Sequence, residues 1–341
     1  MFDTLARAAL GLAFVVIVLG AFVRLSDAGL GCPDWPGCYG QLVGVPQGEA
    51  AVAAANAAYP QRAVDVSKAW KEMIHRYAAG LLGVLALVLA IVAWRNRDHE
   101  QQPVALPLAL LLLVIVQALL GMWTVTLKLQ PAIVMAHLLG GFTTLALLWW
   151  IAMPRIFRTP PALPAESGAL QRLTVLGCVI VVCQIALGGW TSANYAALAC
   201  PDFPTCQTQW WPAANFSHGF TLWHTGAASF EFGVLDSPAR TAIHLAHRVG
   251  ALVTALYVGA LGLALLLRAG KVTRRIGALI LGLLCAQLAL GISNVLFGLP
   301  LAVAVAHNAV AALLLLALLS LIHVVSSAPR QEPLPASPYN S

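Results

Sequence analysis

Long runs of apolar residues, separated by short polar connections, follow one another along most of the chain. An α-helix needs about 20 such residues to cross a lipid bilayer. Runs of this length cannot be buried strands, because an unpaired strand edge is not viable in lipid. The pattern predicts eight membrane-spanning helices, near residues 7–23, 72–94, 104–123, 132–151, 170–190, 241–267, 276–292 and 301–324. We therefore expect an all-α polytopic membrane protein.

The amino-acid composition agrees with a membrane protein rather than a soluble one. Of the 341 residues, 60% are hydrophobic and 9% are charged, whereas a soluble domain carries about 25% charged residues. The net charge of +6 comes from basic residues scattered over short loops, not from a basic patch. We therefore expect membrane lipid as a partner and no nucleic acid.

A repeat relates the two halves of the chain, with offsets of 168 to 172 residues. The matching segments are Cys32-Pro-Asp-Trp-Pro-Gly-Cys38 with Cys200-Pro-Asp-Phe-Pro-Thr-Cys206, His75-Arg76 with His247-Arg248, Gln117-Ala-Leu-Leu-Gly121 with Gln287-Leu-Ala-Leu-Gly291, and His137 with His307. Because four helices separate the matching segments, the repeat keeps one membrane orientation. Two repeated four-helix bundles are the expected architecture.

The repeat predicts the domain organisation. We place the first half at residues 1–158 and the second at residues 159–325. A Pro- and Ser-rich tail at residues 326–341 is expected to be disordered. Basic residues are more frequent on the side of the termini, which predicts cytoplasmic termini. The two long loops, residues 24–71 and 191–240, would then face the periplasm.

Two histidines of each half lie at similar depth in predicted helices, near the end that carries the long loops: His75 and His137, and His247 and His307. Ionisable groups at membrane depth are costly unless they are paired, ligated or functional. Imidazoles on facing helices of one bundle can bind a haem iron from both sides. The sequence therefore predicts a bis-histidine haem site in each half. The alternative is that these histidines bond neighbouring helices or line a polar cavity.

The halves differ three residues before the first histidine of each pair. Glu72 precedes His75 there, whereas His244 precedes His247. A spacing of three places both side chains on one helix face, so a carboxyl group beside a haem could transfer protons. An interfacial ion pair of Glu72 with a nearby lysine is the alternative. For His244, a hydrogen bond to a haem propionate and a place at the interface remain equally open.

Arg76 and Arg248 follow the first histidine of each pair directly. Arginine suits haem propionates because its forked N–H groups match a carboxylate. A snorkelling arginine at the flank of a helix is the alternative.

Each long loop carries a pair of cysteines six residues apart, Cys32 and Cys38 in the first and Cys200 and Cys206 in the second. Two prolines between the cysteines favour a tight turn, and stable disulfides are expected on an oxidising face. Each cysteine pair could be either a structural disulfide or a redox-active pair, and the sequence does not decide between these two roles. A metal site is the weaker reading, because zinc sites use a shorter Cys-x-x-Cys spacing.

His218 and His224 lie in the second long loop, among Trp210, Trp211 and Trp223. This aromatic stretch predicts an amphipathic helix at the membrane surface. A cover over a haem is the alternative role, and the two histidines are weak candidates for chemistry.

The motif that runs from Arg24 through the first cysteine pair to Glu72-x-x-His75-Arg76 resembles the haem A synthase family, as do the other three histidines on eight duplicated helices. The resemblance covers about residues 7–324. It implies successive hydroxylations of the C8 methyl group of haem O, followed by loss of water to give the formyl group of haem A for terminal oxidases.

The resemblance also implies site roles. The second half would hold haem B through His247 and His307, and the first half would receive haem O between His75 and His137. Glu72 would be the catalytic carboxylate. Three arginines are candidate propionate partners, namely Arg24, Arg76 and Arg248.

Haem O synthase, an electron donor and further copies of the chain are the candidate protein partners, and a bacterial inner membrane is the expected location. Two other function classes compete with a haem A synthase. One is a dihaem membrane electron-transfer cytochrome. The other is a thiol–quinone oxidoreductase that uses the loop cysteines. The presence of Glu72 in one half where the other has His244 distinguishes a haem A synthase from these alternatives, because a pure electron carrier does not need the two halves to differ at this position.

Overall fold

The computed structural model describes residues 1–99, 102–156, 167–267 and 270–326. The helices are α1 (Phe2–Leu25), α2 (Glu49–Ala58), α3 (Val66–Arg95), α4 (Ala105–Thr126), α5 (Pro131–Ile156), α6 (Ser167–Ala193), α7 (Phe216–Gly219), α8 (Ser237–Leu266), α9 (Lys271–Leu296) and α10 (Leu301–Ser326). Within the described ranges the chain forms no strand, only two isolated β-bridges in the long loops.

Eight of these helices are long and apolar enough to cross a membrane, which confirms the predicted fold class. Several begin earlier than their apolar runs. Asp65 caps α3 by accepting a hydrogen bond from the Lys68 backbone N–H at 3.0 Å, and Asp236 caps α8 through the Ala239 N–H at 3.0 Å. A side-chain cap supports the polar first turn of a helix, which a search for apolar runs alone does not detect.

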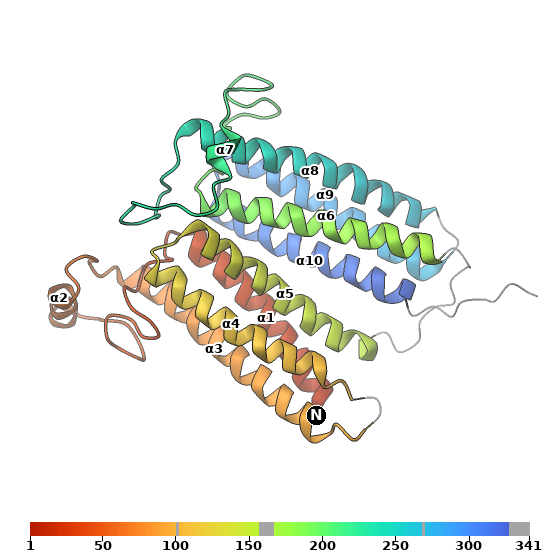
Figure 1. Cartoon of the computed structure of the whole chain (residues 1–341), viewed down its shortest axis with the longest axis horizontal. Helices are drawn as coiled ribbons and strands as arrows, with labels where there is room; N and C mark the ends of the chain where they lie inside the picture. Colours follow the sequence, from red (N-terminus) through yellow and green to blue (C-terminus); the bar gives the residue numbers. More distant parts are fainter. Residues whose placement is uncertain (100–101, 157–166, 268–269, 327–341) are drawn as a thin grey trace, which may run out of the picture.

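The membrane-spanning helices form two sets of four that pack side by side (Figure 1). Helices α1, α3, α4 and α5 make up the first set, and α6, α8, α9 and α10 the second. Between the sets, α1 packs on α10 and α5 packs on α6 and α10. The contacts α1 with α10 and α5 with α6 join the two sets of helices. The predicted domain boundary at residue 158 and nearly all of the predicted tail lie outside the described residues.

A continuous hydrophobic core joins the two sets and leaves an apolar surface toward the lipid. Leu145 of α5 and Leu318 of α10 are both completely buried in this core. On α3, the exposed residues Ile74, Tyr77 and Leu81 follow one another at helical spacing. These residues mark the face of α3 that points away from the bundle and toward lipid.

Both long loops lie at one end of the bundle, which we call the disulfide end (Figure 1). The Ala-rich helix α2 in the first loop was not predicted. The predicted surface helix in the second loop is wrong, since only the four residues of α7 are helical there. Pro212 lies shortly before this helix and Gly219 is its last residue, and both residue types disfavour a longer helix.

A crossing segment of the second loop, residues 224–231, lies over the first half. The Phe230 N–H donates to the Lys128 carbonyl at 3.0 Å, and the Gln130 amide donates to the His224 carbonyl at 2.8 Å. Glu231 accepts two hydrogen bonds from Arg62, at 2.6 and 3.0 Å. The second half therefore contributes part of the cover over the disulfide end of the first half.

Candidate functional site

Each of the four predicted haem-binding histidines packs against a glycine of a neighbouring helix. A β-carbon at Gly20 of α1 would lie 3.1 Å from His75 Cε1, and one at Gly188 of α6 would lie 3.2 Å from His247 Cε1. These glycines occupy equivalent positions of the two halves. A larger side chain at either position would displace the imidazole.

The second histidine of each half has the same surroundings. A β-carbon at Gly121 of α4 would lie 3.5 Å from His137 Cε1, and one at Gly291 of α9 would lie 3.1 Å from His307 Cε1. Within each half, the two imidazoles lie close enough to interact electrostatically. The structure thus places His75 near His137 and His247 near His307, and their binding of haem stays a prediction.

The histidine nitrogens differ in their protein partners. Nδ1 of His75, His137 and His307 is buried without a hydrogen-bond partner. His247 differs, because the Gln184 amide lies 3.0 Å from its Nδ1 and also donates to its carbonyl at 3.0 Å. In the second half, the Gln287 amide lies 3.2 Å from His307 Nε2. Both ring environments of the second half therefore include a glutamine.

These surroundings fit a haem ligand set. The Gln184 amide lies beside Nδ1 of His247, which leaves Nε2 of that ring for a haem iron. All four imidazoles are half-buried and keep accessible surface for a further contact. Neutral imidazole is a common axial ligand of haem iron, and the flanking glycines leave the backbone open beside each ring. The residues present therefore fit two bis-histidine haems.

Both cysteine pairs form disulfides, Cys32–Cys38 and Cys200–Cys206. An aspartate inside each turn holds its backbone. Asp34 accepts from the Tyr39 and Gly40 N–H groups at 2.6 and 2.8 Å, and Asp202 accepts from the Gln207 and Thr208 N–H groups at 2.6 and 3.0 Å. A hydrogen bond from the Thr205 hydroxyl, followed by those from the Thr208 and Gln207 N–H groups, lowers the pKa of the Asp202 carboxyl. The repeated aspartate therefore has a structural role.

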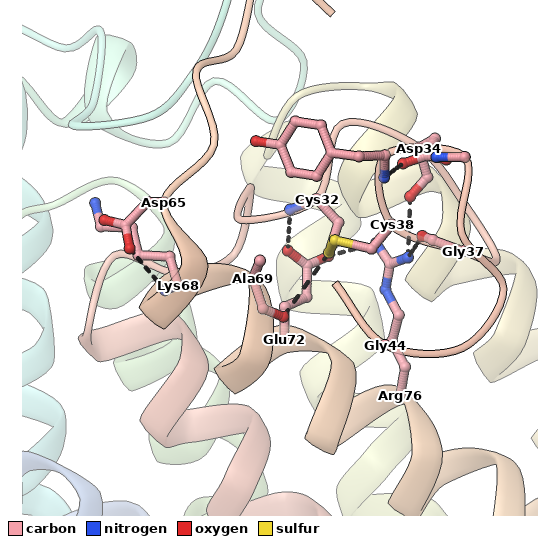
Figure 2. Close-up of a disulfide and its surroundings, with 12 residues drawn as sticks. Cys32, Asp34, Gly37, Cys38, Gly44, Asp65, Lys68, Ala69, Glu72 and Arg76 are labelled. Atoms are coloured by element: carbon pink, nitrogen blue, oxygen red, sulfur yellow. Dashed lines mark hydrogen bonds and ion pairs between the residues drawn. A yellow bond between two sulfur atoms is a disulfide. The ribbon is translucent and has the colours of Figure 1, made fainter. Parts of the chain in front are cut away.

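Glu72 is only 5% exposed and lies directly beneath the first disulfide (Figure 2). Its Oε2 accepts a hydrogen bond from the Cys32 N–H at 2.9 Å, and its Oε1 accepts one from Arg76 at 2.5 Å. The partner of the carboxylate is therefore Arg76 rather than a lysine. This arrangement connects the helix that carries His75 to the disulfide turn.

His244 takes the equivalent place in the second half and is 4% exposed. Its Nδ1 lies 3.0 Å from the Ala196 carbonyl oxygen and 3.4 Å from the Cys200 backbone nitrogen. An imidazole thus lies beside the second disulfide turn, at the place that a carboxylate takes beside the first. The structure gives His244 backbone partners in the second disulfide loop.

Arg76 and Arg248 bind carbonyl oxygens of the disulfide turns. Arg76 donates to the carbonyls of Asp34 at 2.9 Å, Pro36 at 3.2 Å and Gly37 at 2.5 Å (Figure 2). Arg248 donates to the equivalent stretch, at the carbonyls of Cys200, Asp202 and Thr205 over 2.7 to 3.0 Å. Their predicted contact with propionates stays a prediction, and the structure adds a second role for both.

Arg24 connects the two halves instead of remaining in the first. It donates to the Ser192 carbonyl at 2.6 Å, and its guanidinium lies 4.0 Å from the centre of the Tyr195 ring. Its Nε is buried without a partner, so part of the guanidinium is left for a further acceptor. Its predicted role toward a propionate stays a prediction.

His218 and His224 lie close to each other in the second loop, with ring centres 6.4 Å apart. His218 Nδ1 lies 3.5 Å from Asp236, whereas His224 packs against Phe230. Burial, together with the neighbouring His218, lowers the pKa of His224. Throughout the described ranges, no group of three or more histidines, cysteines or acidic residues could hold a metal ion.

The sequence pattern does not indicate that Gln184 and Gln287 lie beside the histidines. The four glycines beside the rings were also missed. The signal that could have found them is the repeat, because Gly20 matches Gly188 and Gly121 matches Gly291 at offsets of 168 and 170 residues, within the range of the other matches.

Comparison with known proteins agrees with the family resemblance. A family model described as COX15-CtaA, cytochrome oxidase assembly protein, matches residues 3–319. A heme A synthase of Shewanella oneidensis is 46% identical over 321 residues, which cover 93% of this chain and 94% of that protein. A heme A synthase of Rhizorhabdus wittichii is 30% identical over 331 residues, with coverage of 90% and 89%. The chain therefore belongs to the COX15-CtaA family, to which the resemblance of its motifs to haem A synthases had pointed.

Proposed function

We propose that this protein is a haem A synthase, an oxidoreductase that converts the C8 methyl group of haem O to a formyl group. Two successive hydroxylations of the methyl carbon and the loss of one water molecule give the product. The observation that carries the proposal is the pair of repeated histidine sites that differ by one buried carboxylate, Glu72, in a chain 46% identical to a heme A synthase.

The two halves have different roles in this proposal. His247 and His307 hold a resident haem B, which supplies a one-electron redox centre when bound. His75 and His137 receive haem O as the substrate. Gln184 and Gln287 orient the two imidazoles of the resident site, because their amides lie within 3.2 Å of the ring nitrogens.

Glu72 is the group that handles protons in the first half. It lies three residues before His75 and so faces the same side of α3. Its carboxylate is held by Arg76 and by the Cys32 N–H, which fixes both oxygens. A carboxylate positioned in this way can accept a proton from a hydroxyl group formed on the substrate methyl carbon.

The proposed location is a bacterial inner membrane, with cytoplasmic termini and a periplasmic disulfide end. The bias of basic residues supports this orientation, and two disulfides at one end agree with an oxidising compartment. Haem O synthase and an electron donor are the proposed partners. A homo-oligomer remains a further proposal.

The experiment that tests the function is co-expression with a haem O synthase in a bacterial host that makes no haem A. Haems are extracted from the membranes and separated by chromatography with mass detection. Haem A or its hydroxylated precursor is the expected product, and the His75→Ala variant is the control that should abolish it. If haem B is bound but neither product is formed, the protein is an electron-transfer cytochrome instead.

A further inference from the structure

Each disulfide turn ends in a pair of exposed apolar residues. After the Cys38–Gln41 bridge come Leu42 and Val43, which are 72% and 83% exposed. After the equivalent Cys206–Gln209 bridge come Trp210 and Trp211, which are 75% and 64% exposed. We call these two pairs the turn tips. Large apolar side chains this exposed at equivalent places of two loops indicate a binding surface rather than scattered exposure.

The first turn tip lies beside the lipid-facing side of α3. The Gly44 N–H, directly after the tip, donates a hydrogen bond to the Tyr77 hydroxyl at 2.8 Å. Tyr77 belongs to the exposed row of α3 that includes Ile74 and Leu81. Figure 2 shows Gly44 beside Arg76, several turns along α3 from its capping residue Asp65. The loop therefore folds back along the outside of the helix.

The length of α3 places this contact at the membrane boundary. Its 30 residues span roughly 45 Å at about 1.5 Å per residue, whereas about 20 residues suffice to cross the hydrocarbon core. About 20 residues counted back from the cap at the opposite end reach Arg76 and Tyr77. Tyrosine is enriched at this level of a membrane protein.

The second turn tip has the same setting. Helix α8 also has 30 residues, and Arg248, at the same depth as Arg76, holds the second turn through the Thr205 carbonyl at 2.7 Å. In Figure 1, the segment between α6 and α7 projects sideways from α8, whereas α2 protrudes beyond the helix ends. Both turns therefore reach sideways over the lipid rather than outward into water.

We propose that both turn tips insert into the boundary between headgroups and acyl chains, in the leaflet at the disulfide end. The ligand is the lipid itself, because the first tip is continuous, through the Gly44–Tyr77 hydrogen bond, with the exposed apolar row of a helix long enough to span a membrane. Leucine and valine favour the acyl side of this boundary, and tryptophan is the residue type most typical of it. The tips thereby fix the two disulfide turns, and Glu72 beneath the first of them, to the membrane surface.

Depth-dependent fluorescence quenching tests this proposal in the full-length protein reconstituted into phosphatidylcholine vesicles. The free cysteines Cys178, Cys183 and Cys285 are replaced by alanine, which leaves both disulfides intact. A single cysteine is then introduced by Val43→Cys or Trp211→Cys and labelled with an environment-sensitive dye. Ala57→Cys, on exposed α2, is the matched control.

A lipid with a nitroxide near the glycerol should quench the labels at positions 43 and 211 at least about twofold more than the label at position 57, while aqueous iodide should do the reverse. If either tip label behaves like position 57, the proposal is overturned. Shielding from iodide without quenching by the lipid would mean a protein partner and would also overturn it. As a second measurement without cysteines, Trp210→Phe with Trp211→Phe should reduce quenching of the intrinsic fluorescence by brominated lipid.

Discussion

Glu72 Oε2 accepts a hydrogen bond from the Cys32 backbone N–H at 2.9 Å, so the carboxylate on α3 holds the start of the first disulfide turn. In the second half, the Cys200 N–H lies 3.4 Å from His244 Nδ1. His244 Nδ1 lies closer to the Ala196 carbonyl oxygen, at 3.0 Å, and a ring nitrogen that donates to this carbonyl cannot also accept from the Cys200 N–H. A hydrogen bond to a charged acceptor is the shorter and stronger kind, so the first turn is tied to its helix more tightly.

Replacing Glu72 separates its structural contribution from its chemical one. In Glu72→Gln the amide oxygen can still accept from the Cys32 N–H, but the ion pair with Arg76 is lost. We expect production of haem A to fall at least about 100-fold, with the haem B absorbance spectrum unchanged and only a modest fall in melting temperature. Haem analysis and thermal unfolding in detergent measure both effects. A variant that keeps its activity would rule out a proton-handling role.

Replacing each turn-binding arginine, Arg76 or Arg248, by alanine should lower the stability of the protein by different amounts. Arg76→Ala leaves the Glu72 carboxylate buried and unpaired, which typically costs about 3–5 kcal/mol. Arg248→Ala removes a similar set of carbonyl contacts but leaves no buried carboxylate without its ion-pair partner. We therefore expect the free energy of unfolding to fall by about 1–3 kcal/mol. Thermal unfolding compares the two. Adding Glu72→Ala to Arg76→Ala should recover part of the loss, whereas equal effects of the two single variants would contradict this account.

Replacing a glycine beside a histidine by alanine should impair haem binding more, the closer the new β-carbon would lie to the imidazole. Gly291→Ala brings a β-carbon to 3.1 Å from His307, so we expect a lower haem B content and a shifted absorbance spectrum. Gly121→Ala, at 3.5 Å from His137, should be tolerated. Gly282→Ala on the same helix α9 meets nothing within 4 Å and should leave haem binding unchanged. Haem content per protein measures these effects, and equal loss in Gly282→Ala would point to a helix effect instead.

The ion pair between Arg62 and Glu231 should make stability depend on pH. The hydrogen bond from Arg62 lowers the pKa of the Glu231 carboxyl below its usual 4.5. A group with a lowered folded-state pKa contributes stability above its unfolded-state pKa and loses it as the pH falls through the folded-state value. The difference in melting temperature between the wild type and Glu231→Gln should therefore be constant above about pH 5 and shrink below it. A difference that stays constant down to pH 3 would exclude the pair as the cause.

Much of the fold could be predicted because a bilayer imposes simple requirements on the sequence. A long apolar run such as residues 301–324 indicates a membrane-spanning helix, and the observed helix α10, Leu301–Ser326, has nearly the same bounds. The polar starts of α3 and α8 were missed because their stability comes from single capping residues, Asp65 and Asp236. The repeat predicts how the four histidines pair, because equivalent positions of repeated helices lie at equivalent depths, and their role as haem ligands stays a prediction.

The partners of the arginines could not be predicted. Arg76 and Arg248 bind loop carbonyls, and the positions of these carbonyls depend on how two proline-containing turns fold back over the helix. Every residue has a backbone carbonyl, so the residue types do not show which carbonyl will accept. The crossing segment was equally invisible, since its contacts with Lys128 and Gln130 join residues about 100 positions apart. Long-range contacts of backbone groups are what the sequence pattern does not encode directly.

The crossing segment also sets an order for biosynthesis. The four helices of the first half are synthesised before residues 224–231, yet Phe230 of that segment covers Leu30, Val125 and Leu129 in the finished protein. A nascent or truncated chain that stops before this segment therefore presents an apolar patch at the disulfide end. Exposed hydrophobic surface of this kind makes an incomplete chain prone to aggregation, so the finished surface of the first half depends on residues 224–231 of the second loop.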